Sequence, residues 1–382
     1  MLAPFASRPS PKLVFGPGTL RELPALVREL GASSVFLVTD TGLMQAGHPE
    51  RAIQLLQSAG LRVAVYDHSH ENPSESDAAT CCDAARAEQF DCFVALGGGS
   101  SMDTAKAANF LLTNGGRMRD YHGYGKATKP MLPLIAIPTT SGTGSECQSY
   151  ALVSRDDTHE KMACGDAKAR ARTAILDPDL TATQPRSVAI QTGLDALAHA
   201  LESAVSTRRN AISSVYSEAA FRHLSSAIGR VVAGAPTAAD RGEMLLGAAL
   251  AGLAIENSML GGAHATANPL TAHFGVIHGH AVALMLPHVM RFNAADPATA
   301  ATYAHYASLL PQTRAADALI NWVTALVDQA AIPRPAPAQP PVSLSTLAVD
   351  AARQWTAQFN PRPLQAEDFV ALYRHALPSA PA

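Results

Sequence analysis

The stretch Val94-Ala95-Leu96-Gly97-Gly98-Gly99-Ser100-Ser101-Met102-Asp103-Thr104-Ala105-Lys106 passes from a buried-strand pattern through three glycines into a helical pattern. Glycines let the backbone approach a ligand closely, and the start of a helix offers unpaired N–H groups and a positive dipole end to a pyrophosphate. A tight turn explains the glycines equally well, so this segment alone does not identify a nucleotide site. Its strand-loop-helix order predicts one unit of an α/β sheet.

A second strand-to-loop element follows further along the chain. The run Leu134-Ile135-Ala136-Ile137-Pro138 leads into Thr139-Thr140-Ser141-Gly142-Thr143-Gly144-Ser145-Glu146, which carries five hydroxyl side chains and two glycines. Two loops of this kind fit a dinucleotide better than either one fits a generic turn. The candidate cofactor-binding residues in the two loops are Gly98, Gly99, Ser100, Asp103, Thr139, Thr140 and Thr143.

Strand and helix patterns alternate through the first half of the chain. We expect strands over residues 34–40, 61–66, 92–96 and 132–137, with helices over residues 49–59, 74–89 and 102–113 between them. Residues 11–16 and 151–156 are less regular and are assigned to edge strands, and residues 172–176 close the series. This β-α-β-α rhythm predicts a parallel sheet with helices on both faces, and therefore a dinucleotide-binding α/β domain over residues 1–184.

Long helical patterns replace the strands beyond residue 184. They cover residues 187–205, 210–232, 240–257, 281–293, 297–309, 315–330, 344–356 and 366–375. A Pro-rich segment over residues 332–341 is expected to be extended. The sequence therefore predicts an all-helical second domain over residues 185–382.

The segment Gly193-Leu194-Asp195-Ala196-Leu197-Ala198-His199-Ala200-Leu201-Glu202 places a carboxylate and an imidazole four residues apart in an apolar helical pattern. Positions i and i+4 share one helix face, so Asp195 and His199 can reach a single ion. His264 and His278 follow further along the chain. One carboxylate and three imidazoles suit a divalent transition metal such as Fe(II) or Zn(II). For each residue taken alone, a polar side chain satisfied by local hydrogen bonds is the alternative.

Four motifs in this order resemble the iron-dependent (group III) alcohol dehydrogenases, which include lactaldehyde reductase-like and butanol dehydrogenase-like enzymes. The matching segments are residues 97–106, 138–146, 193–202 and 278–288. The resemblance implies a Rossmann-like dinucleotide-binding domain followed by an all-helical, metal-binding domain, as in the dehydroquinate synthase-like fold. It also implies NAD and Fe(II) as cofactors, a small alcohol or aldehyde as substrate, and Asp195, His199, His264 and His278 as metal ligands.

Three further residues bear on the cofactor. Asp40 follows the first long strand, where a carboxylate can accept hydrogen bonds from adenosine ribose hydroxyls and repel a 2′-phosphate; a capping or turn aspartate is the alternative. The resemblance also places the ribose-binding aspartate here, which implies NAD(H) rather than NADP(H). It places Asn72 near the adenosine and Lys161 near the ribose and nicotinamide end, with a solvated lysine as the alternative.

One residue departs from the family pattern inside the metal segment. Lactaldehyde:propanediol reductases carry a second histidine four residues after the third ligand, whereas this chain has Asn268 there. Asparagine forms hydrogen bonds but takes up no proton near neutral pH, so a proton-relay role does not transfer and pocket shaping is favoured. We expect nearby His273 to pack in the loop rather than to replace the imidazole.

Composition excludes several classes of function. The 382-residue chain has 29 basic and 32 acidic side chains and a net charge of −3, so nothing suggests a nucleic-acid or anionic-membrane surface. No window has the apolar length of a membrane span, and the first residues lack a signal-peptide pattern. The five cysteines include no Cys-x-x-Cys and are expected to be reduced thiols. We therefore expect a cytoplasmic enzyme, and a homodimer, with no nucleic-acid or membrane partner.

The expected chemistry requires no protein nucleophile. A divalent ion polarises the substrate oxygen while the nicotinamide takes or gives a hydride, so we expect no catalytic residue beyond the metal site. Alternatives on the same fold are glycerol dehydrogenase-type or dehydroquinate synthase-type enzymes with three protein ligands, and maleylacetate reductases, which typically lack this metal set. A non-catalytic nucleotide-binding protein is the alternative from a different class. Four ligand candidates beside two cofactor loops favour the metal-dependent dehydrogenase.

Overall fold

The computed structural model describes residues 4–158, 160–311, 315–334 and 342–377. The chain divides into an α/β unit, Pro9–Gln184, and a helical unit that combines Met1–Arg8 with Pro185–Ala382. The described residues 4–8 therefore group with the helical unit, whereas the sequence analysis included them in a domain over residues 1–184. The physical reason is long-range: the Arg8 guanidinium pairs with the buried Glu256 carboxylate at 3.0 Å, and the Arg8 N–H donates to Asn257 Oδ1 at 2.8 Å.

A parallel sheet forms the centre of the α/β unit. In the described chain it has six strands in the order β1-β9-β6-β4-β2-β3, all parallel. Their bounds are β1 Lys12–Phe15, β2 Ser34–Val38, β3 Arg62–Tyr66, β4 Cys92–Gly97, β6 Leu134–Pro138 and β9 Thr173–Leu176. The expected α/β class is confirmed, with β1 on an edge as predicted and β9 inside the sheet.

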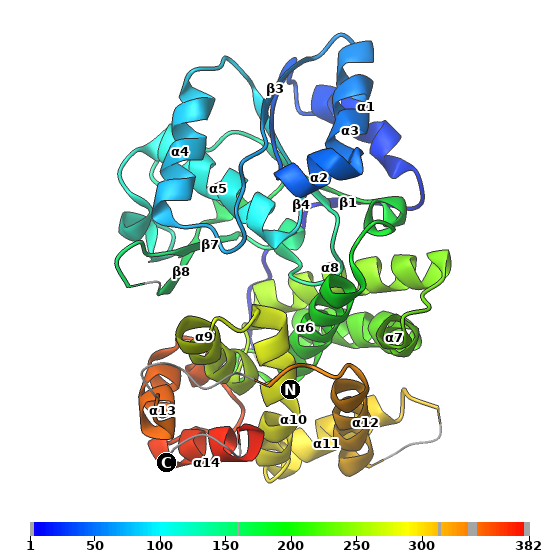
Figure 1. The fold of residues 1–382 in the computed structure, drawn as a ribbon, viewed down its shortest axis with the longest axis vertical. Helices are drawn as coiled ribbons and strands as arrows, with labels where there is room; N and C mark the ends of the chain where they lie inside the picture. The colour runs from blue at the N-terminus through cyan, green and yellow to red at the C-terminus, as the bar shows by residue number, and fades with distance from the viewer. Residues whose placement is uncertain (1–3, 159, 312–314, 335–341, 378–382) are drawn as a thin grey trace. The chain divides into compact units, whose positions relative to one another are not determined.

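Helices cover both faces of this sheet, with α4 and α5 on one side and α1 and α3 on the other (Figure 1). The residues of β2 alternate between two hydrophobic cores: Phe36 and Val38 belong to one, and Val35 and Leu37 belong to the other. This alternation is the period of two that a strand imposes on its side chains. The helix bounds are α1 Leu23–Glu29, α2 Thr41–Ala46, α3 His48–Ser58, α4 Glu75–Arg86 and α5 Gly99–Asn114.

A second, smaller sheet was predicted only in part. It has the order β5-β8-β7, with β5 Gly123–Tyr124, β8 Lys161–Gly165 and β7 Tyr150–Ser154. The sequence analysis assigned an edge strand to residues 151–156, but β7 pairs with β8 in this separate sheet and not with the main one. The other two strands were missed because β5 spans only two residues and β8 is a short strand that begins at Lys161, directly after the polar run of residues 154–160.

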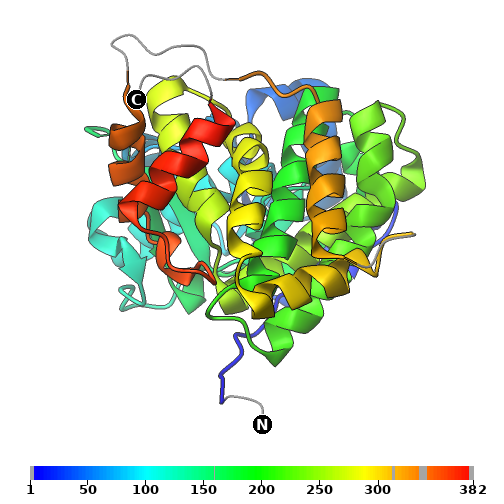
Figure 2. The ribbon, with the colours of Figure 1, turned by 90° about the horizontal axis from the view of Figure 1, so that it is seen from below.

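The helical unit consists of helices that pack side by side, seen from below in Figure 2. Helix α7 contacts α6 and α8, and α10 contacts α6, α9, α12 and α14. Side-chain caps start several of them; for example, Asn210 Oδ1 accepts from the N–H groups of Ile212 and Ser213 at the start of α7. The bounds are α6 Arg186–Val205, α7 Ala211–Ala233, α8 Ala238–Ser258, α9 Gly262–Phe274, α10 His278–Asn293, α11 Pro297–Ala307, α12 Ala316–Gln329, α13 Leu344–Arg353 and α14 Ala366–Ala376.

One helix of this unit was not predicted. Helix α9 contains Pro269 in its interior and begins with a glycine pair, Gly261 as its N-cap and Gly262 as its first residue, and both features argue against a helix in sequence. The Pro-rich segment predicted to be extended lies mostly outside the described residues, which omit 335–341. No single helix in the described part of the chain has the length and apolar character of a membrane span. Helices α8 and α9 pass that test only as a pair, bent by 104° at the break between them.

Candidate metal centre and nucleotide-binding loops

Helix α6 supplies the first two side chains of a buried polar cluster. Asp195 and His199 stand one turn apart, as their spacing predicted, and the Asp195 Oδ1 atom lies 3.6 Å from His199 Nε2. Both residues are buried within a helix that is otherwise apolar over this stretch. Burial of a carboxylate is costly unless it is paired or bound to a metal, so this pair requires a compensating positive charge.

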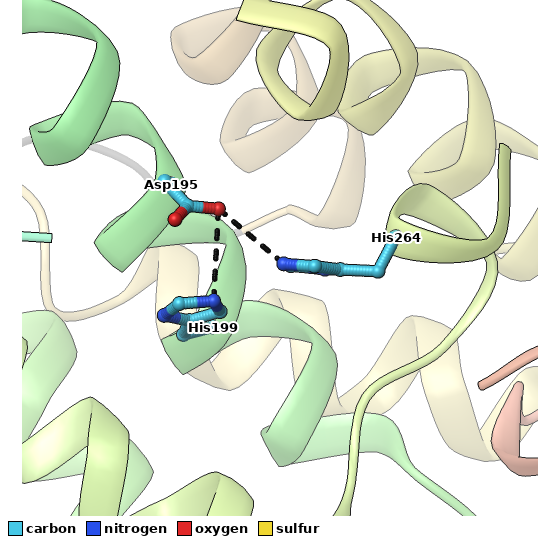
Figure 3. A group of neighbouring side chains, drawn as sticks. All are labelled: Asp195, His199 and His264. Atoms are coloured by element: carbon cyan, nitrogen blue, oxygen red, sulfur yellow. Dashed lines mark ion pairs between the residues drawn. The ribbon is translucent and has the colours of Figure 1, made fainter. Parts of the chain in front are cut away.

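Helix α9 brings His264 to the same point (Figure 3). Its Nε2 atom lies 3.3 Å from Asp195 Oδ1, and its ring stacks on that of His199 with centroids 4.9 Å apart. One donor atom from each of the three residues lies within 4.8 Å of the other two. Two donors that bind one ion at about 2.1 Å stand roughly 3.0–3.5 Å apart, close to the 3.3 Å and 3.6 Å that separate Asp195 Oδ1 from the two histidine Nε2 atoms.

Two polar atoms in the cluster point to a cation. Within the described structure, Asp195 Oδ1 and His264 Nε2 are buried and make no hydrogen bond of good geometry. An unsatisfied buried acceptor costs about 1–3 kcal/mol, and a charged one costs more. The acidic Asp195 and Glu202 together carry two negative charges here when the imidazoles are neutral. This donor set therefore fits a divalent transition metal.

The pKa values of the cluster reflect the same attraction. Burial acts to raise the pKa of Asp195, but the imidazoles of His199 and His264 hold it well below its usual range. Burial acts to lower the pKa of His264, but the carboxylates of Glu202 and Asp195 raise it to about 9. A proton and a metal ion compete for the same imidazole nitrogen, so these carboxylates attract either cation.

Glu202 is the member of this cluster that sequence reasoning did not assign. Its Oε2 atom lies 2.5 Å from His264 Nδ1, and its Oε1 atom accepts from the Ala263 N–H at 2.6 Å. With Nδ1–H donating to Glu202, the His264 Nε2 lone pair faces Asp195. The available signal was position: Glu202 lies seven residues after Asp195, which is the same face two turns along α6.

His278 lies at the first position of α10, next to the cluster. Its ring centroid is 5.5 Å from that of His264, with the planes inclined by 54°. His278 is half-buried and is not part of the three-residue group whose donor atoms converge. Its role as a fourth ligand stays a prediction.

The predicted nucleotide loops lie at the carboxyl ends of neighbouring strands. Asp40 follows β2, the Gly97–Gly99 loop ends β4, and Thr139 follows β6, whose Pro138 pairs with Gly97. The chain continues outward from β2 to β3 on one side, and from β4 to β6 and β9 on the other. This reversal between β2 and β4 is the position at which open α/β sheets bind ligands.

Close packing between the two loops explains their glycines. A Cβ atom on Gly99 would lie 2.7 Å from Thr143 Cγ2 and 2.9 Å from Thr143 Oγ1, and a Cβ on Gly98 would lie 3.5 Å from Thr140 Cγ2. The Thr139 N–H donates to the Gly97 carbonyl at 3.0 Å. Helix α5 begins at Gly99, three residues earlier than predicted, so its N-terminal N–H groups lie in the loop itself.

Asp40 has the capping role that the sequence analysis considered as an alternative. Its Oδ1 atom accepts from the Leu43 N–H at 2.9 Å at the start of α2. Its Oδ2 atom lies 3.4 Å from the Ser101 hydroxyl. Capping therefore occupies one carboxylate oxygen and leaves the second directed toward the glycine loop. Its contact with a ribose stays a prediction.

The structure brings together Asn72 from the loop before α4, Ser100 from α5 and Lys161 from β8. Lys161 Nζ donates to Asn72 Oδ1 at 3.0 Å, and the Asn72 N–H donates to Ser100 Oγ at 3.2 Å. Asn72 has a φ of 52°, a left-handed conformation that asparagine tolerates better than most residues. Lys161 is thus held by an amide next to the glycine loop, which differs from the solvated lysine considered as the alternative.

Asp103 joins the two loops through a buried network. Its Oδ1 atom accepts from Ser145 Oγ at 2.9 Å, and the fully buried Lys106 donates to Ser145 Oγ at 2.8 Å and to the Ser145 carbonyl at 2.6 Å. Burial raises the pKa of Asp103 to about 6, although Lys106 acts to lower it. The network fixes the end of the threonine loop against α5. Direct contact of Asp103 with a cofactor stays a prediction.

Two polar residues that follow His264 on α9, Asn268 and His273, contact the C-terminal part of the chain. Asn268 Nδ2 donates to Gln354 Oε1 at 2.8 Å, and His273 Nε2 lies 2.7 Å from Asp350 Oδ2 on α13. His273 therefore pairs with a carboxylate outside the metal cluster. Asn268 stands one turn beyond His264 on α9, with its amide held by a glutamine that the sequence analysis did not connect to it.

Comparisons with known proteins match both halves of the chain. The family model described as iron-containing alcohol dehydrogenase covers residues 10–178, and that of the Fe-containing alcohol dehydrogenase family, C-terminal, covers residues 189–377.

Individual relatives cover most of the chain. It is 33% identical over 300 residues to the NAD-dependent methanol dehydrogenase of Bacillus methanolicus, and the aligned region covers 78% of each protein. It is 31% identical over 376 residues to the choline dehydrogenase of Bacillus subtilis (strain 168), which spans 96% of this chain and 93% of the relative. A crystal structure of a 1,3-propanediol oxidoreductase matches with a TM-score of 0.91 at 28% identity, over 99% of this chain and 100% of the other.

Proposed function

The chain belongs to the iron-containing alcohol dehydrogenase family, as its four motifs predicted, and we propose that it interconverts a small primary alcohol and its aldehyde with NAD(H) and a divalent metal. The observation that carries this proposal is the convergence of Asp195, His199 and His264 in a buried cluster. A relative that is 33% identical is an NAD-dependent methanol dehydrogenase, which supports NAD as the cofactor.

The metal ligands proposed are Asp195, His199, His264 and His278, and Fe(II) is the first choice of metal, with Zn(II) chemically acceptable. When bound, the ion supplies Lewis acidity toward the oxygen of the substrate. The buried carboxylate of Asp195 would balance part of the charge of the ion. Glu202 holds the Nδ1 side of His264, which keeps Nε2 available as a ligand.

The proposed NAD(H) site uses the loops at the ends of β2, β4 and β6. The N-terminal N–H groups of α5 would bind the pyrophosphate. Gly98 and Gly99 have no side chain, so the backbone of this loop can lie close both to the threonine loop and to the cofactor. Asp40 would accept from the adenosine ribose, and Lys161, oriented by Asn72, would donate toward the ribose and nicotinamide end. Ser100, Asp103, Thr139, Thr140 and Thr143 complete the proposed contacts.

Metal content and turnover measured on the same preparation test the function. Protein purified without air should contain about one equivalent of divalent metal and oxidise NADH when small aldehydes are added. Chelation should remove both properties, and Fe(II) should restore both. Aldehyde-dependent turnover that survives complete metal removal would support the metal-free maleylacetate reductase type of enzyme, and NADH binding without turnover would support a non-catalytic protein.

Cofactor preference should depend on the charge of Asp40. We expect Asp40→Gly and Asp40→Asn to narrow the gap between NADH and NADPH in kcat/KM by about tenfold or more, because both remove repulsion of the 2′-phosphate. Asparagine is a good helix cap and glycine costs only a few tenths of a kcal/mol at this position, so both variants should stay folded. Steady-state kinetics with each nucleotide measures the effect. A parent enzyme that already prefers NADPH would contradict this role of Asp40.

Metal retention should depend on Glu202. Glu202→Gln removes the charge behind His264, and we expect metal affinity to fall about 10- to 100-fold, as for other outer partners of histidine ligands. Competition with a chromogenic chelator measures this directly. The matched control is Glu243→Gln, since Glu243 Oε2 also lies 2.7 Å from a histidine Nδ1, that of His223, in a pair outside the cluster. Equal metal affinity of both variants would remove Glu202 from the site.

Location and assembly are proposed on separate grounds. The five cysteines are all free and buried, which supports a reducing compartment such as the cytoplasm. A homodimer is proposed from the family resemblance, and light scattering at assay concentration tests it. We propose no nucleic-acid partner, because basic and acidic side chains nearly balance along the chain.

A further inference from the structure

Gln191 lies one turn before Asp195 on α6. The spacing of residues 191, 195 and 199 places all three on adjoining positions of one helix face. The start of α10 packs directly against this glutamine: a Cβ atom on Gly279 would lie 2.5 Å from the Gln191 carbonyl oxygen and 3.3 Å from the Gln191 Cβ. Gln191 therefore adjoins both Asp195 and the segment that begins with His278.

The amide oxygen of Gln191 is buried and has no hydrogen-bond partner among the described residues, and the residue as a whole is only 9% exposed. Leaving a buried acceptor without a partner costs about 1–3 kcal/mol. The residues around it on α6 include apolar ones that would pack at no such cost, such as Ile190 and Leu194. A buried amide oxygen without a partner, one helical turn from the Asp195 cluster, is therefore open to accept a hydrogen bond from a ligand.

We propose that Gln191 is a specificity-determining residue that binds a second, uncharged polar group of the substrate, such as a hydroxyl near the reacting carbon. This inference rests on the proposed function, because the substrate must react beside the Asp195 cluster. An amide offers an acceptor and two donors but no charge, so it matches a hydroxyl, which both donates and accepts. Carboxylate, sulfonate and quaternary ammonium groups would have no counter-charge in this side chain.

Pairs of aldehydes in which a hydroxyl replaces a methyl group test this role at constant shape. The pairs are 2-hydroxypropanal with 2-methylpropanal, and 3-hydroxypropanal with butanal. The parent holoenzyme should prefer the hydroxylated member of at least one pair in kcat/KM. Gln191→Met keeps the side-chain length but removes the amide, and we expect the ratio of hydroxylated to apolar substrate to fall about tenfold or more. A site built to bind a substrate hydroxyl discriminates strongly against its absence.

A binding measurement separates this role from metal retention. A diol should raise the Tm of the parent holoenzyme more than the matched mono-alcohol does, and Gln191→Met should remove that difference at unchanged metal content. Gln329→Met, the same substitution at an exposed position on α12, serves as the control and should keep the parent ratio.

Three results would overturn the inference. Turnover with an unchanged substrate ratio in Gln191→Met would overturn it and leave the proposed function intact. Loss of metal together with equal loss of activity toward both members of a pair would assign the amide to metal retention. Absence of turnover with every aldehyde in the metal-loaded parent would overturn the proposed function as well.

Discussion

Replacing His264 by alanine is expected to abolish aldehyde-dependent NADH oxidation and to release the metal. His264 Nε2 is a buried ligand atom 3.3 Å from Asp195 Oδ1, and its other nitrogen is held by Glu202, so the substitution removes one of the three donor atoms that converge in the cluster. The loss of metal affinity should exceed the roughly 10- to 100-fold that removal of an outer partner causes. His278→Ala should likewise lower both NADH oxidation and metal affinity. Metal content after gel filtration, with NADH oxidation on the same sample, measures both effects.

The control for this experiment lies on the same helix. His273 pairs with Asp350 outside the cluster, so His273→Ala removes an imidazole from α9 and should leave the metal in place. Full metal occupancy in His264→Ala would remove His264 from the ligand set. Full occupancy in His278→Ala alone would reduce the site to the three residues whose donor atoms converge.

Gly99→Ala is expected to weaken NADH binding without changing the metal content. The added methyl group would lie 2.7 Å from Thr143 Cγ2 and 3.1 Å from Thr143 Cβ, and the β-branched threonine has little freedom to turn away. Overpacking of this kind costs about 1–3 kcal/mol, which corresponds to about 5- to 150-fold in affinity if it falls on the bound state. The fluorescence of NADH on titration with protein gives the Kd.

A second glycine offers a matched control. Gly229 lies within α7, where an added Cβ would meet nothing within 4 Å. Alanine is favoured over glycine inside a helix by about 1 kcal/mol, so Gly229→Ala should keep the NADH affinity and slightly raise the Tm. An unchanged Kd in Gly99→Ala would show that the contact between the two loops has no part in nucleotide binding.

Local patterns were sufficient to predict the main sheet and most helices. The β2 and β4 strands are continuous apolar runs, which suit a parallel sheet buried on both faces, and α3 and α4 follow as expected. The missed elements lack such patterns. Helix α9 contains Pro269, which removes a backbone donor, and tertiary contacts with elements such as α10 and α13 compensate for that loss.

For the site, the sequence predicted residues but not partners. The pairing of Asp195 with His199 follows from helix geometry alone, because residues i and i+4 are neighbours on one face. The short distance of 3.6 Å between Asp195 Oδ1 and His199 Nε2 agrees with that geometry. Contacts between distant segments were not foreseeable. Glu202 contacts His264, 62 positions away in sequence, and Asn268 contacts Gln354, 86 positions away. No local sequence pattern predicts contacts between residues so far apart in the chain. The capping role of Asp40 could be predicted from the local sequence, and it is compatible with the cofactor role proposed for the same carboxylate.

The pairing of Arg8 with Glu256 has a consequence for synthesis. The two residues are 248 positions apart, so the first segment of the helical unit leaves the ribosome long before its partner helix exists. At about 5–20 residues per second, the wait is roughly 12–50 s. The α/β unit is complete by residue 184 and can fold during that interval. We therefore expect the segment around Arg8 to dock only after Glu256 has been synthesised, when the α/β unit that follows Arg8 in the chain has already had time to form.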